Sequence, residues 1–127
     1  MLKINTLRDA MTDACPWCRA NPEKFTVYVN NGGIETTGES PSYLYRYTLG
    51  IFVMDFTQDL DELMVPLMRW LYRNQPDLLL NPEKNRDIKF SVAINDDDST
   101  DILLEIPVWE RVIIRRNDDG TVHAEHI

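Results

Sequence analysis

The stretch that decides the fold is Tyr43–Phe56, with the sequence YLYRYTLGIFVMDF. Aromatic and aliphatic side chains dominate its odd-numbered positions up to Val53, and such a period of two is typical of a β-strand. The even-numbered positions of its second half are also apolar, with Phe52, Met54 and Phe56. Because both faces are apolar there, we expect a central strand that is covered on both sides of the sheet.

Upstream of this strand, the sequence predicts a short helix and a hairpin. Apolar residues recur at helical spacing over residues 4–15, and Pro16 ends the pattern. Residues 17–23 are predicted to form a loop, and residues 25–29 alternate as in a strand. Asn31, Gly32 and Gly33 tolerate positive φ and therefore favour a hairpin turn, followed by a short returning strand at residues 34–37.

Downstream, the sequence predicts the main helix and a second group of strands. An apolar stripe at helical spacing runs through residues 58–74, with Pro66 inside it. Two strands follow at residues 88–95 and 102–106, joined by a turn at residues 96–100. Pro107 favours a sheet edge or a bulge, because proline has no N–H to donate. Residues 108–116 and 121–126 are expected to be extended on either side of a turn at residues 117–120.

These expected elements define the fold class. They run in the order helix, three strands, helix and then two or three strands, and hairpins dominate the connections. This order predicts an α+β protein with a mostly antiparallel sheet, one main helix and a short N-terminal helix. A chain of 127 residues suits one domain, so we expect residues 1–127 to form a single domain.

The composition limits the classes of partner. Twenty-one acidic and 13 basic residues give a net charge of −8, which opposes sequence-specific binding to nucleic acid and docking on an anionic membrane. No apolar run resembles a signal peptide or a membrane span. Two cysteines are too few for a disulfide scaffold, so a reducing cytoplasm is the expected compartment. Protein partners remain open.

Cys15 and Cys18 form a Cys-x-x-Cys pair, which carries the alternative function of a small cytoplasmic redox or metal-binding protein. The pair is expected at the end of the first helix, where the helix dipole has the wrong sign to stabilise a thiolate. A metal site would need His123 and His126 from the opposite end of the chain, and their spacing in a strand directs the two rings to opposite faces. We therefore expect two ordinary thiols.

No other motif indicates catalysis or a cofactor. Asp96, Asp97 and Asp98 begin a run that resembles a calcium loop, but the sixth and twelfth positions are Asp101 and Pro107 instead of Gly and Glu. A solvated hairpin turn is the simpler interpretation. Since no phosphate loop or nucleophile motif is present either, we expect no enzyme activity, no metal and no cofactor.

Two groups of residues are candidates for contacts between subunits. Tyr43, Tyr45 and Tyr47 share one strand face, where they either pack in the core or meet a neighbouring protein. The loops at residues 30–33 and 96–101 are candidates for a docking face or for the wall of a lumen. In the second loop, Asp96, Asp97 and Asp98 would repel the phosphates of passing DNA.

Several stretches resemble the tail completion protein R family of temperate contractile-tailed phages. Residues 70–77 (WLYRNQPD) are similar to the close of that family's main helix, and residues 90–95, 98–102 and 110–112 to its paired C-terminal strands. Residues 1–4 (MLKI) and 119–126 (DGTVHAEH) resemble its beginning and its end. The likeness covers nearly the whole chain, although this chain ends soon after His126 and carries Cys15 and Cys18.

The resemblance implies a structural protein that finishes the tail so that it can join the filled head. Its implied partners are the tail tube and other tail or head-connector proteins. The family looks similar in architecture to tail terminators, which form hexameric rings, so a tail-terminator-like fold and a homo-oligomer are implied. The implied location is the virion tail, reached from the host cytoplasm during assembly; a prophage remnant that no longer builds particles is a further alternative.

Overall fold

The computed structural model describes residues 2–126, which form four α-helices, two 3₁₀ helices and five strands. In chain order the elements are α1 (Leu2–Ala14), α2 (Pro16–Ala20), η1 (Pro22–Lys24), β1 (Phe25–Thr36), β2 (Tyr43–Phe56), α3 (Asp61–Asn74), α4 (Pro76–Leu80), η2 (Asn85–Asp87), β3 (Lys89–Ile94), β4 (Thr100–Arg116) and β5 (Val122–His126). The predicted α+β class is confirmed, including the short N-terminal helix and the main helix.

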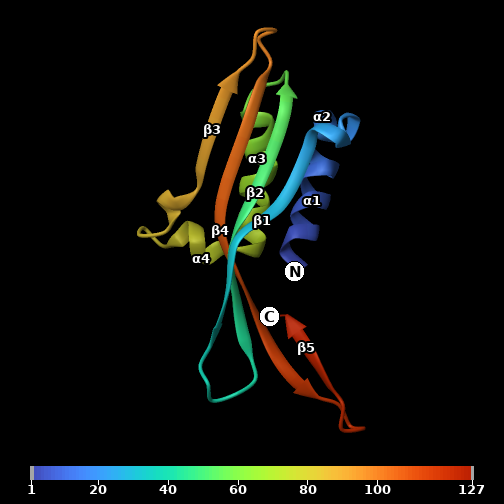
Figure 1. Ribbon diagram of the computed structural model, residues 1–127, viewed down its shortest axis with the longest axis vertical. Coiled ribbons are helices and arrows are strands. Elements are labelled where there is room, and N and C mark those ends of the chain that lie inside the picture. Colours follow the sequence, from blue (N-terminus) through green and yellow to red (C-terminus); the bar gives the residue numbers. More distant parts are fainter. Residues whose placement is uncertain (1, 127) are drawn as a thin grey trace.

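All strands belong to one antiparallel sheet. Its order is β1-β2-β4-β3, and β5 pairs with the far end of β4. The decisive stretch, β2, lies between β1 and β4, as predicted for a central strand. Because β4 is long, β3 pairs with its first part and β5 with its last part on the same side. The sheet is therefore elongated, as Figure 1 shows.

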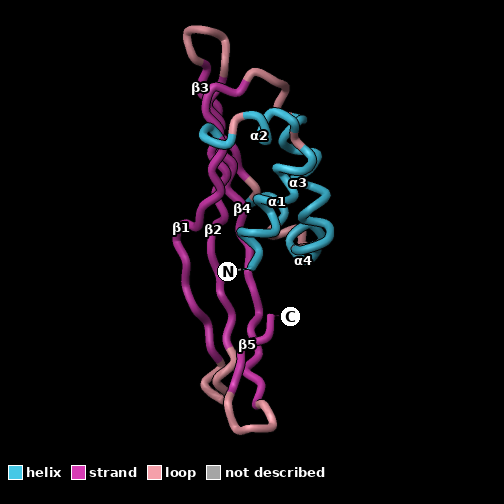
Figure 2. The backbone as a smooth tube through the Cα atoms, turned by 90° about the vertical axis from the view of Figure 1, so that its right-hand side faces the viewer, coloured by secondary structure: helices cyan, strands magenta, loops and turns pink. Residues whose placement is uncertain are grey.

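The core lies between the sheet and one layer of helices. Figure 2 shows the helices on a single side of the strands. Fully buried side chains of α1 and α3 meet those of β2 and β4; they include Leu7, Met11, Leu63, Leu67, Leu71, Leu49, Ile51, Leu104 and Ile106. At about 1.5–3 kcal/mol for each large apolar side chain buried, this layer contact dominates the stabilisation.

The prediction that β2 is covered on both faces was wrong. On the face away from the helices, Met54 is exposed, and the ring of Tyr28 on the neighbouring strand lies over Gly50. Phe56, expected on that open face, is buried in the core and packs edge-to-face against Trp17 with ring centroids 4.9 Å apart. A register shift between Val53 and Phe56 turns the side chain inward.

The hairpin turn predicted at residues 31–33 was also wrong. β1 continues through these residues, and its register against β2 shifts between Asn30 and Gly33. Asn31 has φ of 53°, so the positive φ expected of a turn serves a bulge instead. The chain reverses later, at residues 37–42, where Gly38 has φ of 78°. One long hairpin therefore replaces the predicted short one.

The two longer helices were predicted, whereas α2, α4 and the two 3₁₀ helices were not. α1 ends at Ala14, before Pro16, and α3 contains Pro66 as expected. Residues 17–23, predicted as a loop, instead contain α2 and most of η1. Pro16 ends one helix and occupies the first position of the next, where its missing N–H removes no hydrogen bond.

Pro107 lies where β4 is an edge. The pairing of β4 with β3 ends at Glu105, and its pairing with β5 starts at Val112. In this gap the N–H of Trp109 points away from β2, since it donates to the side chain of Gln75. Two residues earlier, Pro107 has the same orientation, so the missing N–H faces the gap. The predicted edge position of this proline is confirmed.

Candidate functional site: an assembly surface

An arm of β structure, made of residues 31–46 and 109–126, extends beyond the helical layer. In the arm, the far half of β1 pairs with the near half of β2, and β5 pairs with the end of β4. Figures 1 and 2 show both hairpins projecting past the helices. Ile34 and Val122 are 65% and 61% exposed, so the arm presents apolar side chains to its surroundings.

The three tyrosines of β2 divide between the arm and the core. Tyr43 and Tyr45 lie in the arm, half-buried, with ring centroids 5.1 Å apart and ring planes at 82°. Their hydroxyl oxygens are 3.4 Å apart. Tyr47 is buried and directs its hydroxyl at Glu110. In the single chain only Tyr43 and Tyr45 are accessible, and their role as subunit contacts stays a prediction.

A buried carboxylate joins the arm to the body. Glu110 is 3% exposed and accepts a hydrogen bond from the Tyr47 hydroxyl at 2.6 Å and one from the backbone N–H of Lys3 at 3.0 Å. Nδ1 of His126 lies 3.5 Å from Oε1 of Glu110. The carboxylate thus links the first residues of α1, the middle of β2 and the last residues of β5.

The ammonium group of Lys3 completes this junction. It donates to the backbone oxygen of Trp109 at 2.6 Å and to Oε1 of Gln75. Burial lowers the pKa of the Lys3 ammonium, and the carboxylates of Glu110 and Asp77 oppose that shift. Burial and the bond to Glu110 raise the pKa of the Tyr47 hydroxyl. Each buried polar side chain of this junction has a hydrogen-bond partner. Such a network suits a structural connection more than a reactive site.

The sequence held one signal for this junction. Glu110 occupies a position in β4 whose neighbours at a spacing of two, Val108 and Val112, are buried apolar residues. A charged residue at an inward position requires partners, because burying an unpaired carboxylate is strongly unfavourable. The pattern could have predicted a buried carboxylate, but not that its partners come from residues 3, 47 and 126.

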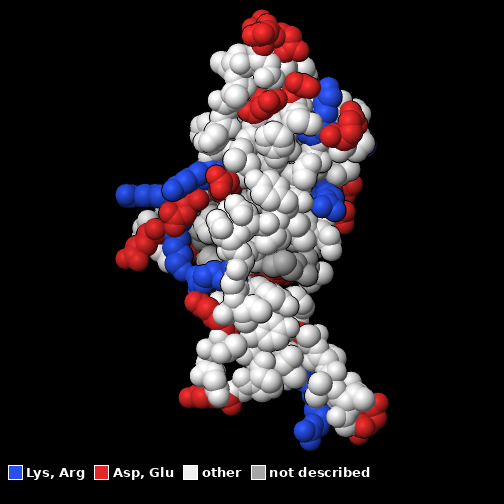
Figure 3. Space-filling view, viewed as in Figure 1, with Lys and Arg blue, Asp and Glu red and all other residues white. Residues whose placement is uncertain are grey.

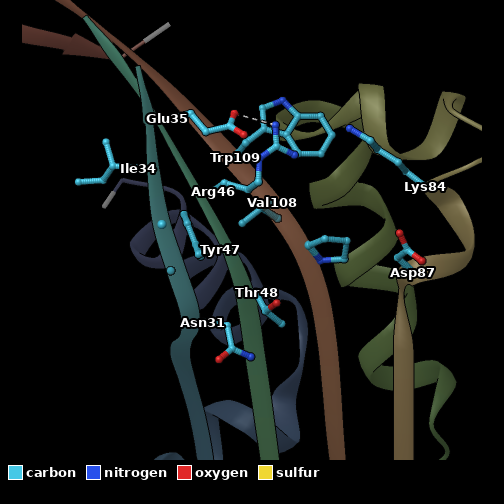
Figure 4. A pocket seen from close by; sticks show the side chains of 13 residues that line it. Asn31, Ile34, Glu35, Arg46, Tyr47, Thr48, Lys84, Asp87, Val108 and Trp109 are labelled. Carbon is cyan, nitrogen blue, oxygen red and sulfur yellow. Dashed lines mark hydrogen bonds and ion pairs between the residues drawn. The ribbon is translucent and has the colours of Figure 1, made fainter. Parts of the chain in front are cut away.

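A hollow of about 500 Å³ lies on the open face of the sheet, beside the root of the arm. Figure 4 shows Arg46, Trp109 and Lys84 along it. Arg46 pairs with Glu35 at 3.0 Å, and the Lys84 ammonium lies 4.8 Å from the centroid of the Trp109 ring. The exposed face of the indole, with Arg46 and Lys84 beside it, allows the hollow to accept a side chain or loop of another protein. The residues that line the hollow include no activated nucleophile.

The opposite end of the molecule carries the predicted acidic loop. Figure 3 shows acidic side chains gathered at the tip, where β3 turns into β4. Oδ1 of Asp97 accepts hydrogen bonds from the N–H and the hydroxyl of Ser99, which lower the pKa of Asp97. Asp98 adopts φ of 66°, a left-handed conformation that Asp tolerates in turns. The loop is an exposed hairpin turn closed by its own side chains, as predicted.

Comparison with known proteins assigns the family. The profile of the family described as P2 phage tail completion protein R (GpR) matches residues 1–127. The chain belongs to this family. Tail completion protein R of Escherichia phage P2 is 40% identical over 129 residues, which cover 100% of this chain and 83% of that protein. No solved structure gives a significant match.

For this tail completion family member, the resemblance noted in the sequence is confirmed along the whole chain. The family is one of phage tail proteins, so the functional surface to look for is one that meets other tail proteins. The arm, the hollow at its root and the acidic tip are the candidates. The arm and the acidic tip lie at the two ends of an elongated molecule, and the hollow lies between them.

The two cysteines lie at the start of a helix, whereas the sequence predicted them at the end of one. Cys15 precedes α2 as its N-cap, and its sulfur accepts a hydrogen bond from the N–H of Cys18 at 3.4 Å. The argument from the wrong end of a helix was therefore incorrect. Both thiols are buried, however, and burial together with the bond to Cys15 raises the pKa of Cys18. A buried thiol with a raised pKa is a poor nucleophile.

The two histidines do not join the cysteines. The ring of His123 contacts Oδ1 of Asn117 at 2.7 Å, whereas His126 lies beside Glu110 on the other face of β5. Within residues 2–126, no group of three or more His, Cys, Asp or Glu side chains is arranged to hold a metal ion. None of the helices in this part of the chain is long and apolar enough to cross a membrane.

Proposed function

We propose that this chain is a structural subunit that completes the phage tail through contacts with other proteins and prepares the tail to join the head. The observation that carries the proposal is the arm, in which apolar side chains such as Ile34 and Val122 are exposed beyond the helical layer. Short hairpins are only marginally stable without a packing partner. A neighbouring protein that packs on the arm would bury this surface.

The same arm supports a homo-oligomer. The arm of one copy would contact a different surface on the next copy. Such heterologous contacts close into a ring when the rotation from one copy to the next allows it. Val65 and Tyr72 are exposed on α3 and offer an apolar partner surface on the next copy. We propose a hexameric ring, as the likeness to tail terminators implies, with Tyr43 and Tyr45 in the contact between copies.

We propose that the acidic tip, which is the β3–β4 turn, faces a channel through which DNA passes. Asp96, Asp97 and Asp98 form the β3–β4 turn, and the whole chain carries a net charge of −8. Carboxylates repel phosphates and so prevent DNA from adhering to a channel wall. Reversing all three to lysine should reduce head joining or infectivity, and unchanged titres would remove this turn from the proposal.

Complementation tests the main proposal. A phage that lacks its tail completion gene would be supplied with variants carrying Ile34→Asp and Val122→Asp in the arm, and finished tails and plaques would be counted. We expect a loss of at least about tenfold, because each aspartate places a charge in an apolar contact. Leu80→Asp, which alters a still more exposed apolar residue on α4, is the matched control. Full complementation by folded arm variants would contradict the proposal.

A further inference from the structure

The free edge of β3 has an unusual side-chain pattern. Phe90, Val92 and Ile94 are 61%, 44% and 77% exposed, although they face the side of the sheet that the helices cover elsewhere. Their partners on β4 at residues 104, 102 and 100 show this, because residues opposite each other in an antiparallel pair share a face. The helical layer does not reach this strand, as Figure 1 shows.

The backbone groups of the same three residues face away from the sheet. Asn95, just beyond β3, donates its N–H to the oxygen of Ser99 at 2.8 Å, so odd-numbered residues of this strand bond to β4. Backbone groups alternate sides along a strand, and those of Phe90, Val92 and Ile94 therefore point to the free edge. Within residues 2–126, no side chain hydrogen-bonds to these groups.

The opposite edge of the sheet is guarded. In β1, the outward oxygen of Val27 accepts a hydrogen bond from Nη2 of Arg8 at 3.2 Å, and α1 packs alongside. A helix that covers an edge strand discourages the pairing of another strand. Alongside the helical layer the two edges are therefore not equivalent, and there β3 is more open to an added strand than β1.

The pattern of β3 matches itself in an antiparallel arrangement. If Val92 faces Val92 of a second copy, then Phe90 faces Ile94 on both sides of the two-fold axis. All three pairs bring outward backbone groups together, and each such pair exchanges two N–H···O bonds. The apolar side chains of both copies then form one continuous stripe on the same face of a joined sheet.

The charges at the two ends of β3 agree with this direction. The chain enters β3 past Lys84, Arg86 and Lys89, which outnumber the carboxylates of the same segment, and leaves it through Asp96, Asp97 and Asp98. Figure 3 shows basic side chains among acidic ones on the flank, and acidic ones alone at the tip. An antiparallel pair places the acidic turn of each copy beside the basic end of the other, whereas a parallel pair would place like charges together.

We propose that two copies of this chain pair through β3 to form a symmetric dimer in solution. The contact is isologous, with the same surface on both copies, and it shields an apolar edge that would otherwise invite aggregation. It goes beyond the proposed role in the tail, because it uses β3 and leaves the arm of each copy free.

Sedimentation equilibrium of the purified full chain tests the dimer. We expect a concentration-dependent species of twice the 14.8 kDa chain mass. Val92→Lys places two ammonium groups opposite each other on the axis and should weaken the association at least about a hundredfold. Ile94→Lys, at the most exposed of the three positions, is a second variant with the same expected direction. Circular dichroism would verify that both variants fold.

Ser91→Lys is the matched control, because it adds the same charge to the same strand on the opposite face and should leave the dimer intact. Raising the salt concentration from about 0.05 M to about 0.5 M should weaken the wild-type dimer by screening the end charges. A wild-type chain that stays monomeric, or an oligomer whose mass Val92→Lys does not change, would overturn the proposal.

Tail completion is scored separately in the complementation assay. Monomeric Val92→Lys that still completes tails supports a dimer confined to solution and leaves the proposed function intact. Arm variants that dimerise normally but fail to complete tails support both proposals at once. A hexamer that persists in Val92→Lys would support the ring and reject the pairing through β3.

Discussion

The hydroxyl of Tyr47 donates to Oε2 of Glu110 over 2.6 Å and joins β2 to β4 where the sheet leaves the helical layer. The same carboxylate accepts from the N–H of Lys3 and lies beside His126. Residues from both ends of the described chain therefore meet at one buried group. This arrangement couples the position of the arm to the integrity of the body, and it yields two measurable consequences.

Tyr47→Phe should lower the free energy of unfolding by about 1–3 kcal/mol, because it leaves a buried carboxylate short of one donor. Tyr43→Phe is the matched control: its hydroxyl meets only that of Tyr45, over a longer 3.4 Å, and should change stability by less than about 0.5 kcal/mol. Chemical denaturation measures both. Equal effects of the two substitutions would argue against the role assigned to the buried bond.

Alkaline conditions should destabilise the wild type through the same residue. The unfolded Tyr47 loses its proton near the ordinary pKa of 10.0, while the folded protein retains it because its pKa is raised. The folded state then binds more protons, so stability falls as pH rises above about 10. Lys3, whose pKa is lowered, acts in the opposite direction. Comparison with Tyr47→Phe isolates the tyrosine; identical pH slopes in the two proteins would contradict this account.

Gly50→Ala tests the close packing of the Tyr28 ring on Gly50, on the face of the sheet away from the helices. A Cβ at this position would lie 2.3 Å from Cζ of Tyr28, so the ring must move and stability should fall by about 1–3 kcal/mol. In a Tyr28→Ala background the same change should have little effect, giving a coupling of about 1 kcal/mol or more. Gly33→Ala is the control, since its nearest neighbour is 4.0 Å away. Additive effects of Gly50→Ala and Tyr28→Ala would reject the contact.

The thiols should react slowly in the folded protein. Cys15 and Cys18 are buried, and the pKa of Cys18 is raised, so modification by a thiol reagent should follow the rate of unfolding. Denaturant should release both thiols to rapid reaction. Replacing both with serine should leave tail completion intact if the double variant folds. Fast labelling of the native protein would instead revive the redox alternative.

Local periodicity was sufficient for much of the fold. The alternation in Tyr43–Phe56 placed a central strand correctly, and the helical stripe that ends at residue 74 located α3. The turn at residues 117–120 and the strand after it also agree, because Gly120 supplies the positive φ that the turn needs. These features depend on neighbours in the chain, whose spacing the sequence displays directly.

The sequence by itself determined which side chains share a face wherever a strand runs without a bulge, the α+β class and, through its matching stretches, the family. Tertiary structure decided whether each face is covered and each edge paired: Asn31 sits in a bulge instead of a turn, Phe56 turns inward, and β3 lies beyond the helices. Tertiary structure also decided the burial of Glu110, because its hydrogen-bond donors come from residues 3 and 47. Periodicity reports local geometry, whereas cover and pairing depend on contacts between residues far apart in the chain.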